Sequence, residues 1–149
     1  MLRCGLLGEK LGHSYSPEIH KMLAGYEYRL YERRAEELES FIRGGEWDGL
    51  NVTMPYKKAV LPLCDELGER ARLSGSVNTL VRRADGSIYG DNTDMFGFES
   101  LLHVNGIDPA GMKALVLGNG GACASVRAVL DSLGARTVVI SRRGEDNYN

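Results

Sequence analysis

Short apolar runs alternate with segments of helical spacing along the N-terminal part of the chain. The apolar runs predict strands at 2–8, 26–32 and 48–53. Two further β-rich runs flank Asp85-Gly86, a pair that strongly indicates a hairpin turn. This part of the chain therefore predicts a sheet whose other strands are connected by helices.

Apolar residues three and four positions apart predict these helices. Ser16-Pro17-Glu18 is typical of a helix start, because serine caps free N–H groups and proline needs no partner there. Ile19, Met22 and Leu23 then form one apolar stripe. Leu38, Phe41 and Ile42 mark a second predicted helix. A third begins at Pro55 and runs towards Cys64, and two more cover 66–74 and 94–104.

A run of turn residues at 105–111 is the best candidate for a domain boundary. Beyond it the pattern predicts one β-α-β unit, whose first strand is continuously apolar, as in parallel sheets buried on both faces. Its segments are 113–118, 121–134 and 136–141. We expect an α/β protein with an open, mostly parallel sheet domain at 1–104 and the start of a Rossmann domain at 105–149. A complete dinucleotide-binding sheet needs about five or six strands, so the second domain is expected to be incomplete.

Charge and cysteine content narrow the class of protein. The 20 acidic and 18 basic residues are mixed along the chain, which argues against a general nucleic-acid surface. No apolar run approaches the ~20 residues that span a bilayer, and the first segment turns polar too soon for a secretory signal. Cys4, Cys64 and Cys123 are isolated, which favours neither a disulfide framework nor a metal site. We expect a cytoplasmic protein with free thiols and no metal.

A glycine-rich turn connects the first strand of the predicted β-α-β unit to its helix. Gly118, Gly120 and Gly121 follow a buried strand and precede a helix, a context in which backbone N–H groups bind a pyrophosphate. The third glycine position of the dinucleotide fingerprint falls on Cys123, which is still a small residue. The alternative is a simple tight turn.

Two cations follow the last predicted strand. An NAD site usually has an acidic residue roughly 20 positions beyond its glycines. Here Arg142 lies 24 positions beyond Gly118 and is followed by Arg143. Guanidinium groups favour a 2′-phosphate and therefore NADP, and a solvated basic pair is the alternative.

Further polar residues lie at the ends of predicted strands, where open α/β sheets bind ligands. Ser14 and Ser16 offer two hydroxyls that suit a carboxylate, unless Ser16 is only a helix cap. Asn78 can donate to and accept from a polyol, and Asp94 lies in a segment that alone indicates a turn and a helix cap. Lys57 lies in the first turn of a predicted helix, where a cation is disfavoured. The alternative for Lys57 is an exposed residue whose stem covers apolar surface.

Five motifs occur in the order found in shikimate dehydrogenases, a family that the chain resembles over essentially its whole length. They are SYSP at 14–17, NVTMPYK at 51–57, GSVNT at 75–79, GDNTD at 90–94 and GNGGA at 118–122. The chain departs from the family in having Ser141-Arg142-Arg143 where Asn-Arg-Thr is common. It also stops before the rest of the family's cofactor sheet, a substrate-contacting glutamine and the C-terminal helices.

The resemblance implies a role for each matching residue. Ser14 and Ser16 are expected to hold the carboxylate of shikimate, and Thr53, Asn78 and Asp94 its ring hydroxyls. Lys57 is expected to contact the substrate and to form the catalytic pair with Asp94. The expected NADP-binding residues are Glu69, Gly118, Asn119, Gly120, Gly121, Ala122, Ser141, Arg142 and Arg143.

The reaction implied is reversible NADPH-dependent reduction of 3-dehydroshikimate to shikimate, in aromatic amino-acid biosynthesis. The expected partner is this small molecule, and the oligomeric state is left open. The predicted helix and partial desolvation destabilise the Lys57 ammonium, whereas Asp94 stabilises it, and the sequence leaves the balance open. Two alternatives remain: quinate as substrate with NAD, and a non-catalytic shikimate-binding fragment. We expect these 149 residues to bind shikimate weakly without turnover.

Overall fold

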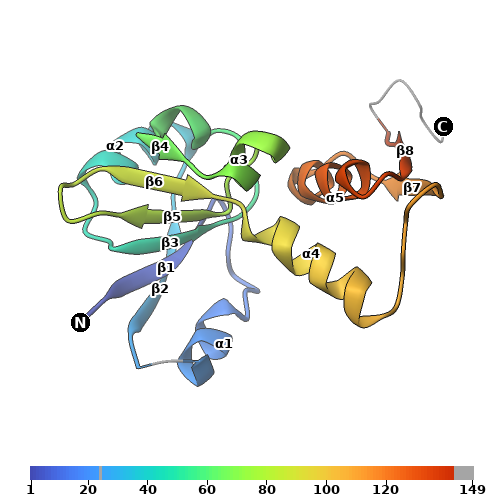
Figure 1. Ribbon diagram of the computed structural model, residues 1–149. Coiled ribbons are helices and arrows are strands. Elements are labelled where there is room, and N and C mark those ends of the chain that lie inside the picture. Colours follow the sequence, from blue (N-terminus) through green and yellow to red (C-terminus); the bar gives the residue numbers. More distant parts are fainter. Residues whose placement is uncertain (24, 143–149) are drawn as a thin grey trace.

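A computed structural model describes residues 1–23 and 25–142 of the chain. Six strands form its larger sheet, in the order β2-β1-β3-β5-β6-β4 (Figure 1). Only β5 runs antiparallel to its neighbours in this sheet, so the expected open and mostly parallel α/β arrangement is confirmed. The strands are β1 Arg3–Gly8, β2 Glu27–Glu32, β3 Gly49–Val52, β4 Glu66–Leu67, β5 Thr79–Arg82 and β6 Ile88–Asp91.

One face of the larger sheet carries the main hydrophobic core. The elements beside its strands are α1 Ser16–Leu23, η1 Ala35–Glu37, α2 Leu38–Gly44, η2 Leu61–Leu63 and α3 Glu69–Ser74. The spacing of Leu38, Phe41 and Ile42 correctly predicts their burial, and they pack with the fully buried Trp47. Because strand side chains alternate between faces, the opposite face receives the intervening polar residues of β2, β3 and β5.

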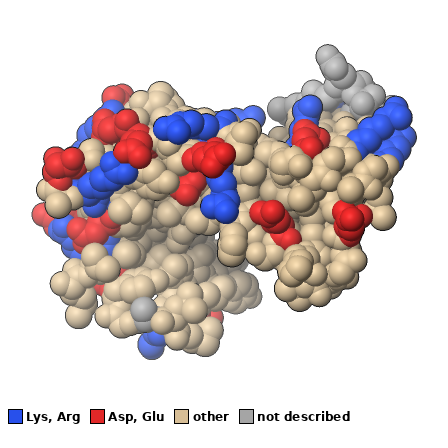
Figure 2. All heavy atoms as spheres, viewed as in Figure 1, with Lys and Arg blue, Asp and Glu red and all other residues tan. Residues whose placement is uncertain are grey.

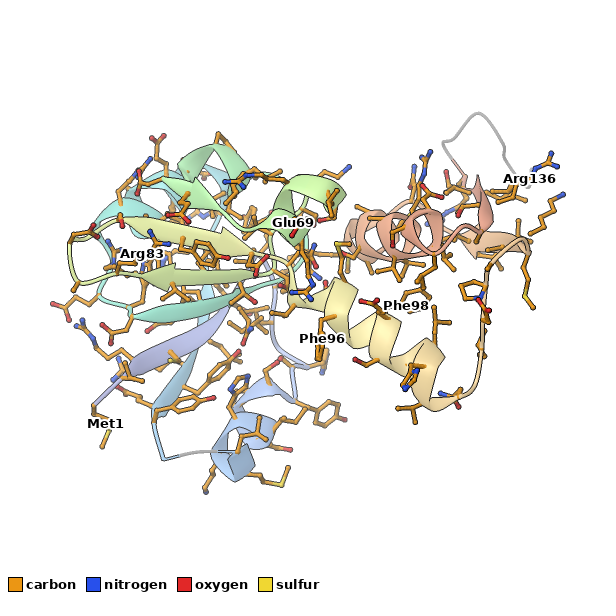
Figure 3. All side chains as sticks on the ribbon, viewed as in Figure 1. Met1, Glu69, Arg83, Phe96, Phe98 and Arg136 are labelled. Carbon is orange, nitrogen blue, oxygen red and sulfur yellow. The ribbon has the colours of Figure 1, made fainter. Side chains whose placement is uncertain are left out.

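A second, smaller unit follows the hairpin of β5 and β6. It consists of β7 Lys113–Leu117, α5 Gly121–Ser132 and β8 Arg136–Ile140, with β7 and β8 parallel, and α4 Thr93–Val104 leads into it. In Figure 1, α4 leads away from the larger sheet and lies beside α5. Met95 and Leu102 of α4 pack with Val129 and Leu130 of α5, and Phe98 lies against this cluster (Figure 3). The boundary at 104/105 remains a prediction.

The helix predicted at Pro55 is wrong. Residues 54–60 form turns and lead into η2. Pro62 lacks the N–H group that would continue a helix from Pro55, which leaves the intervening segment too short. Lys57 therefore lies in a turn, and the unfavourable helix dipole expected for it does not act there.

Three further expectations are corrected by the structure. The apolar stripe of α1 is not buried, since Ile19, Met22 and Leu23 are 49%, 80% and 70% exposed. Among the described residues, helices cover only one face of β7, so Leu115 and Leu117 are 56% and 73% exposed. The helix predicted at 66–74 is shorter, because Glu66–Leu67 pairs with β6 as β4.

Candidate active site

Lys57, Asn78 and Asp94 come together from three separate elements. Lys57 lies in the turn after β3, Asn78 directly precedes β5, and Asp94 lies in the first turn of α4. Lys57 Nζ lies 2.5 Å from Asp94 Oδ2, and Asn78 Nδ2 donates to Asp94 Oδ1 at 2.7 Å. The Lys57 side chain is 14% exposed and that of Asp94 is 34% exposed. The pair is therefore sheltered but open to solvent on one side.

Backbone hydrogen bonds fix this cluster to the sheet. The Val77 N–H donates to Lys57 O at 2.8 Å, and the Asn78 N–H donates to Asp91 O at 3.0 Å. The Asn78 amide also accepts from the Thr93 N–H at 2.8 Å and donates to Thr93 Oγ1 at 3.0 Å. Both hydrogens of this amide are thus used within the protein, and Asn78 holds Asp94 in position at the start of α4.

The two predicted carboxylate ligands lie side by side before and at the start of α1. Ser14 Oγ donates to Ser16 Oγ at 3.1 Å and accepts from the Ser16 N–H at 3.2 Å. Ser16 makes no side-chain cap bond among the described residues, so the alternative of a simple helix cap is not what the structure shows. Thr53 follows β3, where its N–H donates to Leu7 O at 2.9 Å. Its hydroxyl has no partner within the described residues.

Sequence reasoning missed Tyr28 and assigned no role to Asn51, although Asn51 opens the motif at 51–57. Tyr28 of β2 donates its hydroxyl to Asn51 Oδ1 of β3 at 2.7 Å. Burial raises the pKa of Tyr28 to about 12, and the polar Ser16 side chain opposes this rise. The polar Asn51 at the end of an otherwise apolar strand is the one signal in the sequence that points to this pair.

The glycine turn faces Lys57 across a cleft of about 290 Å³. A Cβ added at Gly121 would lie 3.4 Å from Lys57 Cδ, so the turn lies close to the lysine stem and a side chain at this position would contact it. Gly118 has a φ of 103°, a conformation that favours glycine. The lining residues are Met54, Pro55, Lys57, Lys58, Asn119, Gly120 and Gly121.

The predicted cofactor residues fit a dinucleotide at the turn. Gly118 and Gly120 have open space where a side chain would lie, and the first free N–H groups of α5 follow them, beside the exposed Ala122. Ser141 is 3% exposed and its hydroxyl has no partner among the described residues.

The other predicted cofactor residues lie further from the cluster or outside the described part. Arg142 is exposed beyond β8, and Arg143 lies outside the described residues. Glu69 begins α3 (Figure 3), is exposed, and makes no hydrogen bond to Lys57, Asn78 or Asp94.

On the face that Figure 2 shows, surface charge does not single out a polyanion-binding patch. Figure 2 shows basic and acidic side chains interspersed over the larger sheet unit on the visible face. Among the residues that the structure describes, no helix is both long and apolar enough to cross a membrane. The same residues contain no cluster of three or more His, Cys, Asp or Glu side chains placed to hold a metal ion.

Comparison with known proteins assigns the site to a family. A model of the shikimate dehydrogenase substrate binding domain matches residues 6–80. The chain belongs to the shikimate dehydrogenase family. NADP(+)-dependent shikimate dehydrogenases from Rubrobacter xylanophilus and Methanopyrus kandleri are 41% and 42% identical over 93% and 95% of the chain. The chain spans 52% of each, so it covers about half the length of these relatives.

Solved shikimate dehydrogenases have the same fold. Shikimate dehydrogenase 1 from Peptoclostridium difficile superposes with a TM-score of 0.88 at 35% identity, over 98% of this chain and 57% of that chain. The Thermus thermophilus enzyme, solved in complex with NADP(H) and shikimate, gives 0.84 at 33% identity, over 96% and 57%. The family assignment therefore agrees with both sequence and fold.

Proposed function

We propose that this chain is the substrate-binding part, with the start of the cofactor domain, of an NADP-dependent shikimate dehydrogenase. The reaction is the reversible reduction of 3-dehydroshikimate to shikimate. The observation that carries the proposal is the Lys57–Asp94 pair, held by Asn78 and facing the glycine turn. Relatives named for this activity, and a neighbour solved with NADP(H) and shikimate, support it.

Each residue has a defined task in this reaction. NADPH, when bound, supplies the hydride that adds to the carbonyl carbon. Lys57 gives a proton to the carbonyl oxygen, and in reverse it removes the proton from the hydroxyl. Asp94 orients the lysine, and Ser14 and Ser16 bind the carboxylate at the other end of the ring.

Titration of the 149-residue chain with shikimate, followed by amide NMR signals, tests the binding part of the proposal. We expect saturable shifts at Ser14, Ser16, Asn78 and Asp94, with quinate as the comparison ligand. An absence of shifts at millimolar shikimate contradicts the proposal. We expect no NADPH oxidation with 3-dehydroshikimate, because the chain covers about half of its relatives. Robust turnover contradicts that expectation while leaving the assignment of the reaction intact.

A further inference from the structure

The outer edge of β2 is open at one end of the larger sheet. Among the described residues, β1 is the only strand that pairs with β2 (Figure 1). The backbone N–H groups of Glu27 and Arg33 donate toward β1, at 3.2 and 3.0 Å, so the odd-numbered residues of β2 face this neighbour. The N–H groups of Tyr28, Leu30 and Glu32 therefore point outward, where no described residue accepts from them.

The side chains along this edge are complementary to a second copy of the same strand. Two identical edges can pair as antiparallel strands about a two-fold axis. An axis at Leu30, which is 40% exposed, places this leucine opposite its own copy. The same axis places Glu27 opposite Arg33 of the partner subunit, and opposite charges across a strand pair stabilise it. Arg33 already lies at the edge, because its Nη1 donates to Glu32 O at 2.7 Å.

Charge disfavours the neighbouring registers of this strand pair. An axis between two residues pairs an outward-pointing backbone group with an inward-pointing one, so the axis must pass through a residue. An axis at Arg29 places two arginines opposite each other, and an axis at Tyr31 places Arg29 opposite Arg33 of the partner subunit. Like charges directly opposite are destabilising. The axis at Leu30 is therefore the one that the charge pattern favours.

Apolar surface lies beside the same edge. His20 of α1 stacks on Tyr28 with centroids 3.8 Å apart, so α1 lies on the sheet face to which Tyr28 and Leu30 point. A two-fold axis through the strand pair places both α1 helices on this face of the joined sheet. Their exposed apolar stripes then add apolar surface beside the new strand pair.

We propose that a second copy of this chain binds along β2, as an antiparallel strand with Leu30 on the two-fold axis and Glu27 facing Arg33 of the partner subunit. The two six-stranded sheets then form one continuous sheet. Both ends of this sheet are the strand β4, which has only two residues and is too short to recruit a further copy. Association therefore stops at a dimer.

Sedimentation equilibrium of the 149-residue chain tests the proposal. We expect a monomer–dimer equilibrium that depends on protein concentration. Leu30→Lys places two ammonium groups on the axis, so the dissociation constant of the dimer should rise at least about 10-fold. Leu73→Lys is the matched control, because Leu73 is a 64% exposed leucine of α3, away from β2, and should leave the constant unchanged.

Charge reversal tests the register. Glu27→Arg and Arg33→Glu should each raise the dissociation constant at least about 10-fold, since each places like charges opposite one another. The two substitutions combined should restore the constant to within about 3-fold of the wild-type value, because the cross-strand pair is then re-formed with its charges exchanged. Arg72→Glu, on exposed α3, is the control for the change in net charge.

Amide exchange provides a test that depends on no variant. In the dimer, the outward N–H groups of Tyr28, Leu30 and Glu32 become hydrogen-bonded, so their exchange should slow as the protein concentration is raised. The N–H groups of Arg29 and Tyr31 face β1 already, and their exchange should depend much less on concentration.

Each other result overturns the proposal. A chain that stays monomeric at millimolar concentration has no such interface. A dimer that withstands Leu30→Lys and leaves the three outward amides unprotected uses another surface, such as the exposed face of β7. Protection of these amides in a monomer shows that the chain covers its own edge. A combined variant as weak as the single ones rules out the pairing of Glu27 with Arg33.

Discussion

Both the backbone and the side chain of Lys57 are held by bonds to other elements. Its carbonyl accepts from the Val77 N–H, and its ammonium pairs with Asp94. In a protein with a complete cofactor domain, Lys57→Ala is expected to reduce turnover by roughly 10²- to 10⁴-fold, the usual share of general acid–base catalysis. Steady-state kinetics of NADPH oxidation measure this, with a smaller expected change in KM. Near-normal turnover would remove Lys57 from the mechanism, and Lys21→Ala on exposed α1 is the control.

Cys64 offers a second test at the scale of one residue. Burial raises the pKa of the Cys64 thiol to about 11, and the charge of Asp65 adds to the rise. Because the thiolate is the reactive form, alkylation by iodoacetamide at pH 8 should be roughly 100-fold slower than for a thiol of the ordinary value, 9.0. Mass spectrometry of peptides labelled in the native state and in urea gives both rates. Equal rates in the two states contradict the burial of this thiol.

The end of helix α2 depends on a residue far along the chain. Arg82 Nη2 donates to Ile42 O at 2.7 Å, and its guanidinium lies 4.2 Å from the Trp47 ring centroid. Arg82→Lys keeps the charge but loses the planar fork, so we expect a loss of about 1–3 kcal/mol of stability. The urea midpoint at unchanged m-value measures this.

A neighbouring arginine provides the control for Arg82. Arg83 pairs with Glu66 at 2.5 Å, but both side chains are about half exposed. Arg83→Lys should therefore change stability by less than about 1 kcal/mol. Equal losses in the two variants contradict a special role for the hydrogen bonds from Arg82 to α2.

Elements that depend on near neighbours were predictable from the sequence. Asp85-Gly86 does form the turn between β5 and β6, with Gly86 at a φ of 85°, and α1 does begin at Ser16. The segment after Pro55 was not predictable in the same way. Its helical potential is cancelled by Pro62, and its turns are fixed by long-range bonds such as Val77 N–H to Lys57 O.

The geometry of the candidate site was likewise not predictable from local sequence. Its candidate residues were named from motifs and family resemblance, since spacing alone does not reveal that Lys57 and Asp94 meet. The Tyr28–Asn51 bond depends on strand order and register, because β1 lies between β2 and β3. Tyr28 pairs with β1 from one side and Asn51 pairs with it from the other. Sequence pattern predicts which residues share a face, but not which strands become neighbours.

The two units of the molecule are connected by one buried polar contact. Asn92 is fully buried and caps α4 by accepting from the Met95 N–H at 3.3 Å. Its Nδ2 donates to Ser76 O at 2.9 Å and to Ser125 Oγ of α5 at 2.8 Å. Among the described residues, the Asn92–Ser125 contact provides the only hydrogen bonds between 1–104 and 113–142. It sets the start of α4, which carries Asp94, against the helix that follows the glycine turn.

Loss of the Asn92–Ser125 contact should lower the stability of both units. Asn92→Ala removes a helix cap and leaves buried partners unsatisfied, so we expect a loss of about 2–4 kcal/mol. Ser125→Ala should cost only about 1 kcal/mol, because Asn92 keeps its partners at Ser74 and Ser76. Asn105→Ala, at the exposed opposite end of α4, is the control and should cost less than about 1 kcal/mol. Urea unfolding measures these losses.

Hydrogen exchange determines whether the contact couples the two helices. Asn92→Ala should speed amide exchange in α5 as well as in α4, whereas Asn105→Ala should affect only the end of α4. If α5 keeps its protection when Asn92 is removed, the apolar contacts of Met95 and Leu102 with α5 suffice to hold the units together. The distance between the glycine turn and Lys57 then depends on packing, and Ser125 has no part in setting it.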